Sequence, residues 1–161
     1  MGYYDQMQVC LNGHQITDRA REYAHHRAKH CKTCGAATID SCTRCNAPIK
    51  GDYVVEGVLS IGGYPTPIPN YCENCGGAFP WQEAAIENLR EILNEGDLSE
   101  ADMTVFENAI PDVIRETPKT ESASLRLKRV MGGLGKPVYD VAIKVVSDIA
   151  SETAKKTMGL A

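Results

Sequence analysis

The chain has 161 residues and a formal net charge of −4, a length that fits one domain or two small ones. The acidic balance excludes sequence-independent binding of nucleic acid over the whole surface, which leaves that role only to a local basic segment. No apolar run approaches the roughly 18 residues that span a bilayer, and the N-terminus lacks the basic and apolar regions of a secretory signal peptide. We therefore expect a cytoplasmic protein without a membrane span.

The two halves of the chain differ in charge and in residue types. Residues 1–80 contain seven Lys and Arg against seven Asp and Glu, whereas residues 81–161 contain ten against fourteen. All seven cysteines and all four histidines lie in the first half, between Cys10 and Cys75. This division predicts two domains, a small metal-bound domain over 1–80 and a helical domain over 81–161.

Short strands and turns are expected in the first half. Residues 3–10 have the β-prone, partly alternating pattern of a strand that ends at the first cysteine. Residues 17–29 are polar and fit either one short helix or a polar loop. Residues 52–61 predict a strand or one arm of a hairpin, interrupted at Gly57. The three prolines within 62–69 favour extended backbone.

The second half shows the period of helices. An apolar stripe predicts a first helix over 81–96, and a cap at Ser99 begins a second helix that Pro111 should kink or restart. A third helix is expected over 121–131 and a fourth over about 138–156. The predicted fold class is therefore α+β, with tandem ribbons of short β-hairpins followed by a helical region.

Four short pairs of cysteine and histidine give the clearest signal in the sequence. They are Cys10 with His14, Cys31 with Cys34, Cys42 with Cys45, and Cys72 with Cys75. Thiolate and imidazole are ligands of zinc, and eight of them complete two closed tetrahedral sites. Reducing conditions in the cytoplasm and the odd number of cysteines also favour metal over disulfides. We therefore predict two bound zinc ions.

Two arrangements of these pairs are compatible with the sequence. In tandem zinc ribbons the first pair shares an ion with the second, and the third with the fourth. In a cross-brace, as in RING-type domains, the first pair shares its ion with the third instead. Glycine follows the second pair at Gly35 and the fourth pair at Gly76, so each of these pairs reads as the closing knuckle of its own site. We favour the sequential arrangement.

The histidine ligand is assigned from the turn before it. Gly13 precedes His14 and gives the backbone the freedom that a tight knuckle needs. His25, His26 and His30 are the alternatives, and His30 stands directly before a cysteine. We favour His14 as the ligand and expect the other three on a polar surface.

Several elements of the first half occur in one combined motif. They are Cys-x-Asn-Gly-His at 10–14, Cys-x-x-Cys-Gly at 31–35, Cys-x-x-Cys at 42–45, a Gly/Tyr/Pro-rich loop at 62–69, Tyr-Cys-x-x-Cys-Gly at 71–76 and Pro-Trp at 80–81. This order resembles an uncharacterised family of bacterial double zinc-ribbon proteins, classed as a domain of unknown function. The resemblance covers about the first half and implies two zinc ions and a ribbon fold, but no catalytic residue. Asn46 departs from it, because ribbons often have glycine after the second cysteine of a knuckle.

Nothing in the sequence predicts catalysis. A catalytic zinc ion keeps one coordination position open, and eight ligands for two ions leave none. A phosphate-binding loop is excluded at Gly135-Lys136, because its motif needs glycine and Ser or Thr where this chain has Val130 and Pro137. We expect a protein that is not an enzyme.

Two functions from different classes remain open. The first is an interaction, scaffold or regulatory module, in which the ribbons present a rigid face to a protein partner and the helices self-associate or make a second contact. Residues 138–150 are apolar around most of a helix, so this helix needs cover from its own bundle or from a second copy.

The alternative is a nucleic-acid-binding ribbon. Segment 19–32 contains five cations and three histidines against one acid, Glu22, and Tyr23 could stack on a base. An ordinary solvated surface is the simpler interpretation of this segment. An adaptor or ligase-like role is a third, minor alternative, because it requires the cross-brace.

Overall fold

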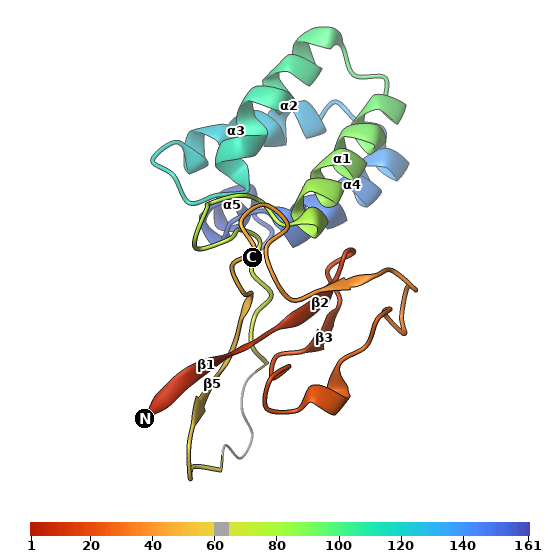
Figure 1. The fold of residues 1–161 in the computed structure, drawn as a ribbon. Helices are drawn as coiled ribbons and strands as arrows, with labels where there is room; N and C mark the ends of the chain where they lie inside the picture. The colour runs from red at the N-terminus through yellow and green to blue at the C-terminus, as the bar shows by residue number, and fades with distance from the viewer. Residues whose placement is uncertain (60–64) are drawn as a thin grey trace. The chain divides into compact units, whose positions relative to one another are not determined.

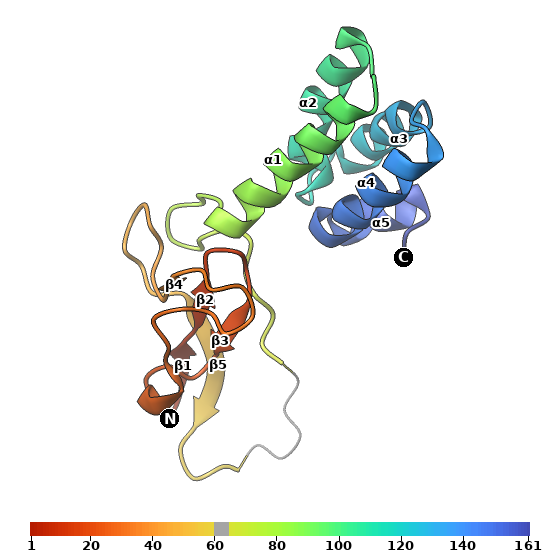
Figure 2. The same cartoon turned by 90° about the vertical axis from the view of Figure 1, so that its right-hand side faces the viewer.

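The structure is a computed structural model, and it describes residues 1–59 and 65–161. The chain forms two compact units, Met1–Ala84 and Ala85–Ala161. Short strands and knuckles make up the first, which we call the ribbon unit, and helices make up the second, the helical unit (Figures 1 and 2). The protein therefore has an α+β fold with N-terminal ribbons and a C-terminal helical region.

In the described part of the ribbon unit, five short strands form two small antiparallel sheets. They are β1 (Gly2–Gln6), β2 (Gln8–Cys10), β3 (Gln15–Thr17), β4 (Thr38–Ile39) and β5 (Lys50–Val55). Strand β1 pairs with β5, and Figure 1 shows the two running side by side. Strand β2 lies between β3 and β4 in the other sheet. The single strand expected over 3–10 is thus two strands that belong to different sheets.

The break between these strands has a packing cause. Met7 separates β1 from β2, is fully buried, and donates its N–H to the carbonyl of Ile49 at 2.8 Å. The chain changes partners at this residue, because its side chain enters the core and its backbone bonds to the segment before β5. Sequence alternation does not show such a change, since the residue types on both sides are β-prone.

Strand β5 ends before Gly57, which has a left-handed backbone with φ of +78°. Ser60 and Ile61, at the end of the arm expected over 52–61, lie outside the described residues, as do residues 62–64 of the expected proline loop. Residues 65–69 have no regular secondary structure.

The polar segment 17–29 is mostly irregular, with one short 3-10 helix, η1 (Ala24–His26). Two buried polar side chains hold it against the strands. The carboxylate of Asp5 accepts the backbone N–H groups of Arg21 and Glu22, both at 3.0 Å. The amide of Gln8 exchanges two hydrogen bonds of 3.0 Å with the backbone of Ala28. This irregular segment therefore has a fixed path without a core of its own.

A small apolar cluster forms the core of the ribbon unit. Its buried members are Met7, Val9, Cys42, Ile49, Cys72, Phe79 and Trp81. The rings of Phe79 and Trp81 stack with centroids 4.7 Å apart, and Trp81 Nε1–H donates to the carbonyl of Pro69 at 3.0 Å. Two of the cysteines predicted as ligands are thus part of the core.

Five helices follow, one more than the sequence predicts. They are α1 (Pro80–Glu95), α2 (Glu100–Val113), α3 (Thr120–Met131), α4 (Lys136–Ile149) and α5 (Glu152–Met158). The hydroxyl of Ser99 caps α2 as expected, accepting the N–H of Asp102 at 3.1 Å. Helix α2 continues through Pro111 to Val113, so it does not restart there.

The fourth helix, expected to run to about residue 156, is divided. Ala150 is extended, with ψ of 146°, and Ser151 caps the new helix α5 by accepting the N–H of Ala154. The N–H of Ser151 is bound to the carbonyl of Val113 at the end of α2. This tertiary hydrogen bond and the serine cap together outweigh the continuous apolar pattern.

The helical unit has its own core, with Leu89, Phe106, Leu127 and Val146 among its fully buried side chains. The apolar side of α4 packs into this core and leaves Val141 half-exposed. Much of the cover of this apolar helix therefore comes from the same chain.

Candidate metal centres

The first ligand pair lies at the end of β2. Gly13 has a left-handed backbone with φ of +87°, and the turn returns His14 to the strand end, where the N–H of Cys10 donates to the His14 carbonyl at 2.9 Å. The N–H of His14 is directed at the Cys10 sulfur at 3.2 Å. The predicted knuckle at this pair is therefore present.

The three Cys-x-x-Cys pairs share one backbone pattern. In each, the N–H of the first cysteine donates at 2.8 Å to the carbonyl five residues later. The residue after the second cysteine donates back to the carbonyl of the first and has a left-handed backbone, with φ of +72° at Gly35, +59° at Asn46 and +71° at Gly76. Asparagine tolerates this conformation better than most residues with a side chain. Asn46 thus replaces glycine without changing the knuckle.

The eight side chains come together as two groups of four. One group contains Cys10, His14, Cys31 and Cys34, and the other contains Cys42, Cys45, Cys72 and Cys75. Within each group, all ligand atoms lie within 4.8 Å of one another. The structure therefore has the sequential arrangement and not the cross-brace.

The spacing of these atoms can be compared with that of a bound ion. A tetrahedral zinc ion with Zn–S bonds of about 2.3 Å sets its sulfur atoms about 3.8 Å apart. The Sγ atoms of Cys10 and Cys34 are 3.7 Å apart, and the second group has Sγ–Sγ distances of 3.8 Å and 3.6 Å. His14 faces the first group through Nδ1, which lies 3.4 Å from Cys10 Sγ. All seven thiols are free, and these three Sγ–Sγ distances match the separation that an ion shared within each group requires.

Backbone amides favour the ionised form of two outer thiols. The N–H of Ala36, helped by the side-chain amide of Asn12, lowers the pKa of Cys34 to about 6. The N–H of Ala47 does the same for Cys45, whose pKa is also about 6. Thiolate is the metal-binding form of cysteine, so these two sulfurs are ready ligands at neutral pH.

Burial follows the order within the pairs. The first cysteine of every pair is buried, whereas Cys34, Cys75 and His14 are exposed. Each group therefore has an inner side that joins the protein core and an outer side that solvent can reach. An ion can enter from outside and then fix the core side by its bonds to the buried thiols.

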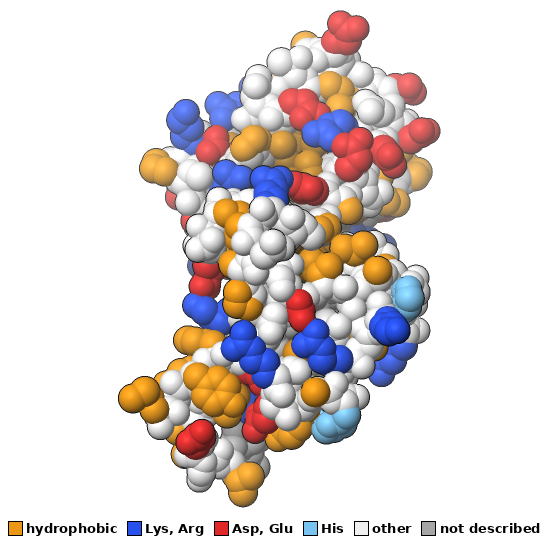
Figure 3. All heavy atoms as spheres, viewed as in Figure 1, with side chains coloured by type: hydrophobic (Ala, Val, Ile, Leu, Met, Phe, Trp, Pro, Cys, Tyr) orange, Lys and Arg blue, Asp and Glu red, His pale blue; other side chains and the backbone are white. Residues whose placement is uncertain are grey.

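The other three histidines lie elsewhere on the ribbon unit. His25, His26 and His30 are exposed and belong to neither group. The rings of Tyr23 and His26 lie 5.4 Å apart, and those of His25 and His26 lie 4.3 Å apart. Figure 3 shows histidine side chains at the surface of the protein. The three histidines are therefore exposed as expected, and two of them form a small ring cluster with Tyr23.

The family comparison supplies the wider context of these two groups. The family described as "Uncharacterized protein conserved in bacteria (DUF2321)" matches residues 3–158. The chain belongs to this family. The match also includes the helical region, so it extends well beyond the first half to which the motif resemblance was limited. No curated protein and no solved structure matches the chain.

Within this family match, the two ligand groups fit a double zinc ribbon. In the part of the chain that the structure describes, no helix has the length and apolar character to cross a membrane.

Proposed function

We propose that this chain is a zinc-binding cytoplasmic protein without enzymatic activity, which acts as an interaction, scaffold or regulatory module. The two complete sets of four donors carry the first part of this proposal. Three thiolates with one imidazole, and four thiolates, are donor sets typical of structural zinc. Because protein groups fill all four positions of each site, no position is left for a substrate or a reactive water.

The surface of the ribbon unit supports the interaction role. Exposed apolar side chains concentrate on β1, β5 and the turn after β5, where Tyr4 is 53% exposed, Val58 66% and Leu59 89%. Figure 3 shows hydrophobic side chains gathered near the free end of these strands. Several large exposed apolar side chains in one region are typical of a protein contact. We therefore assign the contact with a protein partner to this face, which we call the β1–β5 face.

The apolar side of α4 gives less support to self-association. Most of it is covered within the helical unit, and Leu125 and Val141 are isolated exposed residues on α3 and α4. Single exposed apolar residues are normal on any protein surface. The β1–β5 face is therefore the stronger candidate.

In the structure, carboxylates neutralise two of the arginines on which the nucleic-acid alternative depends. Arg19 is paired with Asp52 at 2.7 Å and with Glu22 at 3.1 Å. Arg27 is paired with Asp40. A phosphate backbone would have to displace these carboxylates before it gained either arginine. Arg21, Lys29 and Lys32 remain exposed, which is a small number of cations for binding that depends on phosphate contacts.

A capture experiment with matched variants tests the protein-contact proposal. The intact chain, the double variant Val58→Ser/Leu59→Ser and the control Leu125→Ser are used as baits after elemental analysis has counted their zinc. We expect two zinc ions in all three, and a partner retained by the intact chain and the control but lost by the double variant. Equal capture by all three would contradict the assignment of this face.

A mobility-shift assay at low salt tests the alternative. A shift that is abolished in Arg27→Glu/Lys29→Glu would favour nucleic acid as the partner. We expect no shift with the intact chain.

A further inference from the structure

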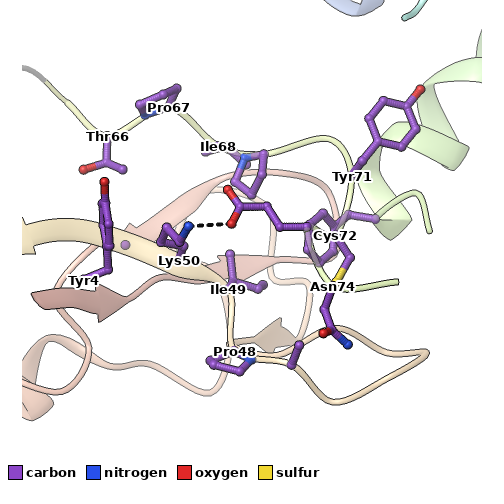
Figure 4. A pocket seen from close by; sticks show the side chains of 15 residues that line it. Tyr4, Pro48, Ile49, Lys50, Thr66, Pro67, Ile68, Tyr71, Cys72 and Asn74 are labelled. Atoms are coloured by element: carbon purple, nitrogen blue, oxygen red, sulfur yellow. Dashed lines mark hydrogen bonds and ion pairs between the residues drawn. The ribbon is translucent and has the colours of Figure 1, made fainter. Parts of the chain in front are cut away.

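A mostly apolar cavity of about 470 Å³ lies beside the second ligand group, within the ribbon unit. Figure 4 shows Tyr4 at one end and Cys72 at the other, with Ile68 on one side and Ile49 on the opposite side. Ile49 is 2% exposed and belongs to the core of the unit. Pockets of about 300–1,000 Å³ with apolar linings are the usual sites of small ligands.

The walls of this cavity are stiff before anything binds. Pro48, Pro67 and Pro69 line it, and their fixed backbone angles limit its collapse. Proline also has no N–H, so these parts of the wall cannot supply a backbone donor to a ligand. At these positions, polar recognition must come from side chains.

One ion pair supplies the charge at the rim of this cavity. Among the described residues that line the cavity, Lys50 is the one cation and Glu73 the one carboxylate. Their Nζ and Oε2 atoms are 2.5 Å apart, and Figure 4 marks this contact with a dashed line. The ammonium of Lys50 also lies 4.8 Å from the centre of the Tyr4 ring. Two contacts thus hold the Lys50 ammonium, one with the Glu73 carboxylate and one with the ring of Tyr4.

The two partners of this pair are held differently. Lys50 begins β5 and is paired with Gln6 of β1, so its backbone is fixed by a sheet. Glu73 lies in the turn between Cys72 and Cys75, and its side chain is 71% exposed. The carboxylate can therefore move into solvent at little cost, whereas the Lys50 side chain, 47% exposed, keeps its contact with the Tyr4 ring. The position of the Glu73 carboxylate marks where an anion is stabilised in this cavity.

We propose that this cavity binds a small apolar carboxylate, whose body lies between Ile49, Ile68 and the ring of Tyr4 and whose carboxylate replaces that of Glu73 on Lys50. The exchange leaves Lys50 with one negative partner before and after binding, so no charge is left unpaired. The apolar lining supplies the gain, because it removes the body of the ligand from water. This site goes beyond the proposed function, which requires no small ligand.

A titration of the zinc-loaded chain with two matched compounds tests the proposal. The compounds are 4-phenylbutyrate and its neutral analogue 4-phenylbutanol, and amide NMR shifts give both the affinity and the position. We expect saturable one-to-one binding, with shifts at 47–51 and 66–74, and about tenfold tighter binding of the acid because of its charge-assisted hydrogen bond.

Two charge variants should change the affinity for 4-phenylbutyrate in opposite directions if the exchange occurs. Lys50→Gln should weaken 4-phenylbutyrate binding about tenfold and abolish the preference over the alcohol. Glu73→Gln should tighten it several-fold, because the internal competitor has lost its charge. Lys29→Gln, at an exposed cation outside the cavity, is the control and should change neither. Zinc content is measured for each variant, so that a lost metal site is recognised.

The contribution of the apolar lining to ligand binding is tested separately. Tyr4→Ala should weaken acid and alcohol alike, whereas Tyr3→Ala, one residue away and outside the cavity lining, should weaken neither. Equal affinity for acid and alcohol, weaker binding in Glu73→Gln, or shifts elsewhere on the chain would each overturn the proposal.

The carboxylate has two sources, a free acid or the end of another chain. A short peptide ending in leucine, with a free or an amidated C-terminus, separates them in the same titration. Tighter binding of the free-ended peptide than of 4-phenylbutyrate would identify a chain end as the ligand, and the reverse would identify a small acid. Binding of neither overturns the site.

Discussion

Removal of the metal should unfold the ribbon unit and leave the helical unit folded. The apolar cluster of the ribbon unit contains, besides its cysteines, five buried apolar side chains, Met7, Val9, Ile49, Phe79 and Trp81. At about 2 kcal/mol for each buried side chain, they contribute on the order of 10 kcal/mol. One structural zinc ion contributes about 10–16 kcal/mol in small zinc domains. A zinc ion bound at each predicted site would therefore stabilise this unit at least as much as its apolar cluster does.

The stabilisation lost when both ions are removed is larger than the net stability of a typical domain, which is about 5–15 kcal/mol. The helical unit contains no predicted ligand and has a separate core, so its stability should not depend on the ions. Chelation followed by amide hydrogen exchange is the direct assay, with circular dichroism at 222 nm as the readout of the helices. Protection should be lost within 1–84, except in α1, and kept in the helices. Unchanged protection of the strands after complete metal removal would refute this reasoning.

Three substitutions test single features of the fold. Asn46→Ala should lower the free energy of unfolding of the metal-loaded chain by about 1 kcal/mol in thermal unfolding, because alanine is strained in the left-handed backbone. Asn46→Gly should not lower it, and equal effects of the two substitutions would argue against the knuckle geometry. Ser151→Ala should cost about 1 kcal/mol in urea unfolding of the helices, because it removes the cap of α5; no cost would contradict the divided helix. Glu107, whose pKa Arg90 holds below its usual value, should contribute about 0.5 kcal/mol to the stability of the helical unit above pH 4.5. Because the folded pKa is the lower one, this contribution is lost as the pH falls through it, and a cost of Glu107→Gln that is the same at about pH 3 and 7 would disprove it.

The candidate metal centres could be predicted from the sequence because their geometry is local. Two ligands separated by two residues fit on one knuckle, and the left-handed position after the second cysteine selects glycine or asparagine. Gly35, Asn46 and Gly76 occupy that position with nearly the same φ. The choice of partner between knuckles is less local, and chain order was sufficient for it here, because each closing knuckle follows its own opening knuckle.

The sheet pairing and the cavity could not be predicted in this way. Strand β1 pairs with β5 across most of the ribbon unit, and nothing in either segment identifies the other. The cavity combines side chains from β1, from segment 47–51 after the third knuckle, from the proline segment 66–69 and from the fourth knuckle at 71–74. The division at Ser151 had a local signal, a serine followed by Glu152, but the apolar period continued through Ala150 and concealed it.

The closing knuckle of the second group connects the metal with the proposed ligand. Cys72 and Cys75 belong to the ligand group, Cys72 also lines the cavity, and Glu73 between them competes for Lys50. If the ion holds this wall in place, the carboxylate binds only the metal-loaded form. In that case the carboxylate must raise the apparent affinity for the metal, by a factor that depends on its concentration relative to its dissociation constant. At a ligand concentration ten times its dissociation constant, that factor is about tenfold.

Competition with a chelator measures this linkage. We expect 4-phenylbutyrate to raise the chelator concentration needed for half-release of one of the two ions by about tenfold, and 4-phenylbutanol at the same concentration to raise it less. Lys50→Gln keeps every predicted ligand, so it should keep the metal but lose the effect of the acid. Release of both ions at the same chelator concentration with and without the acid would show that the cavity and the metal are independent. In that case, the second ion would stabilise the core through Cys42 and Cys72 without shaping the cavity wall.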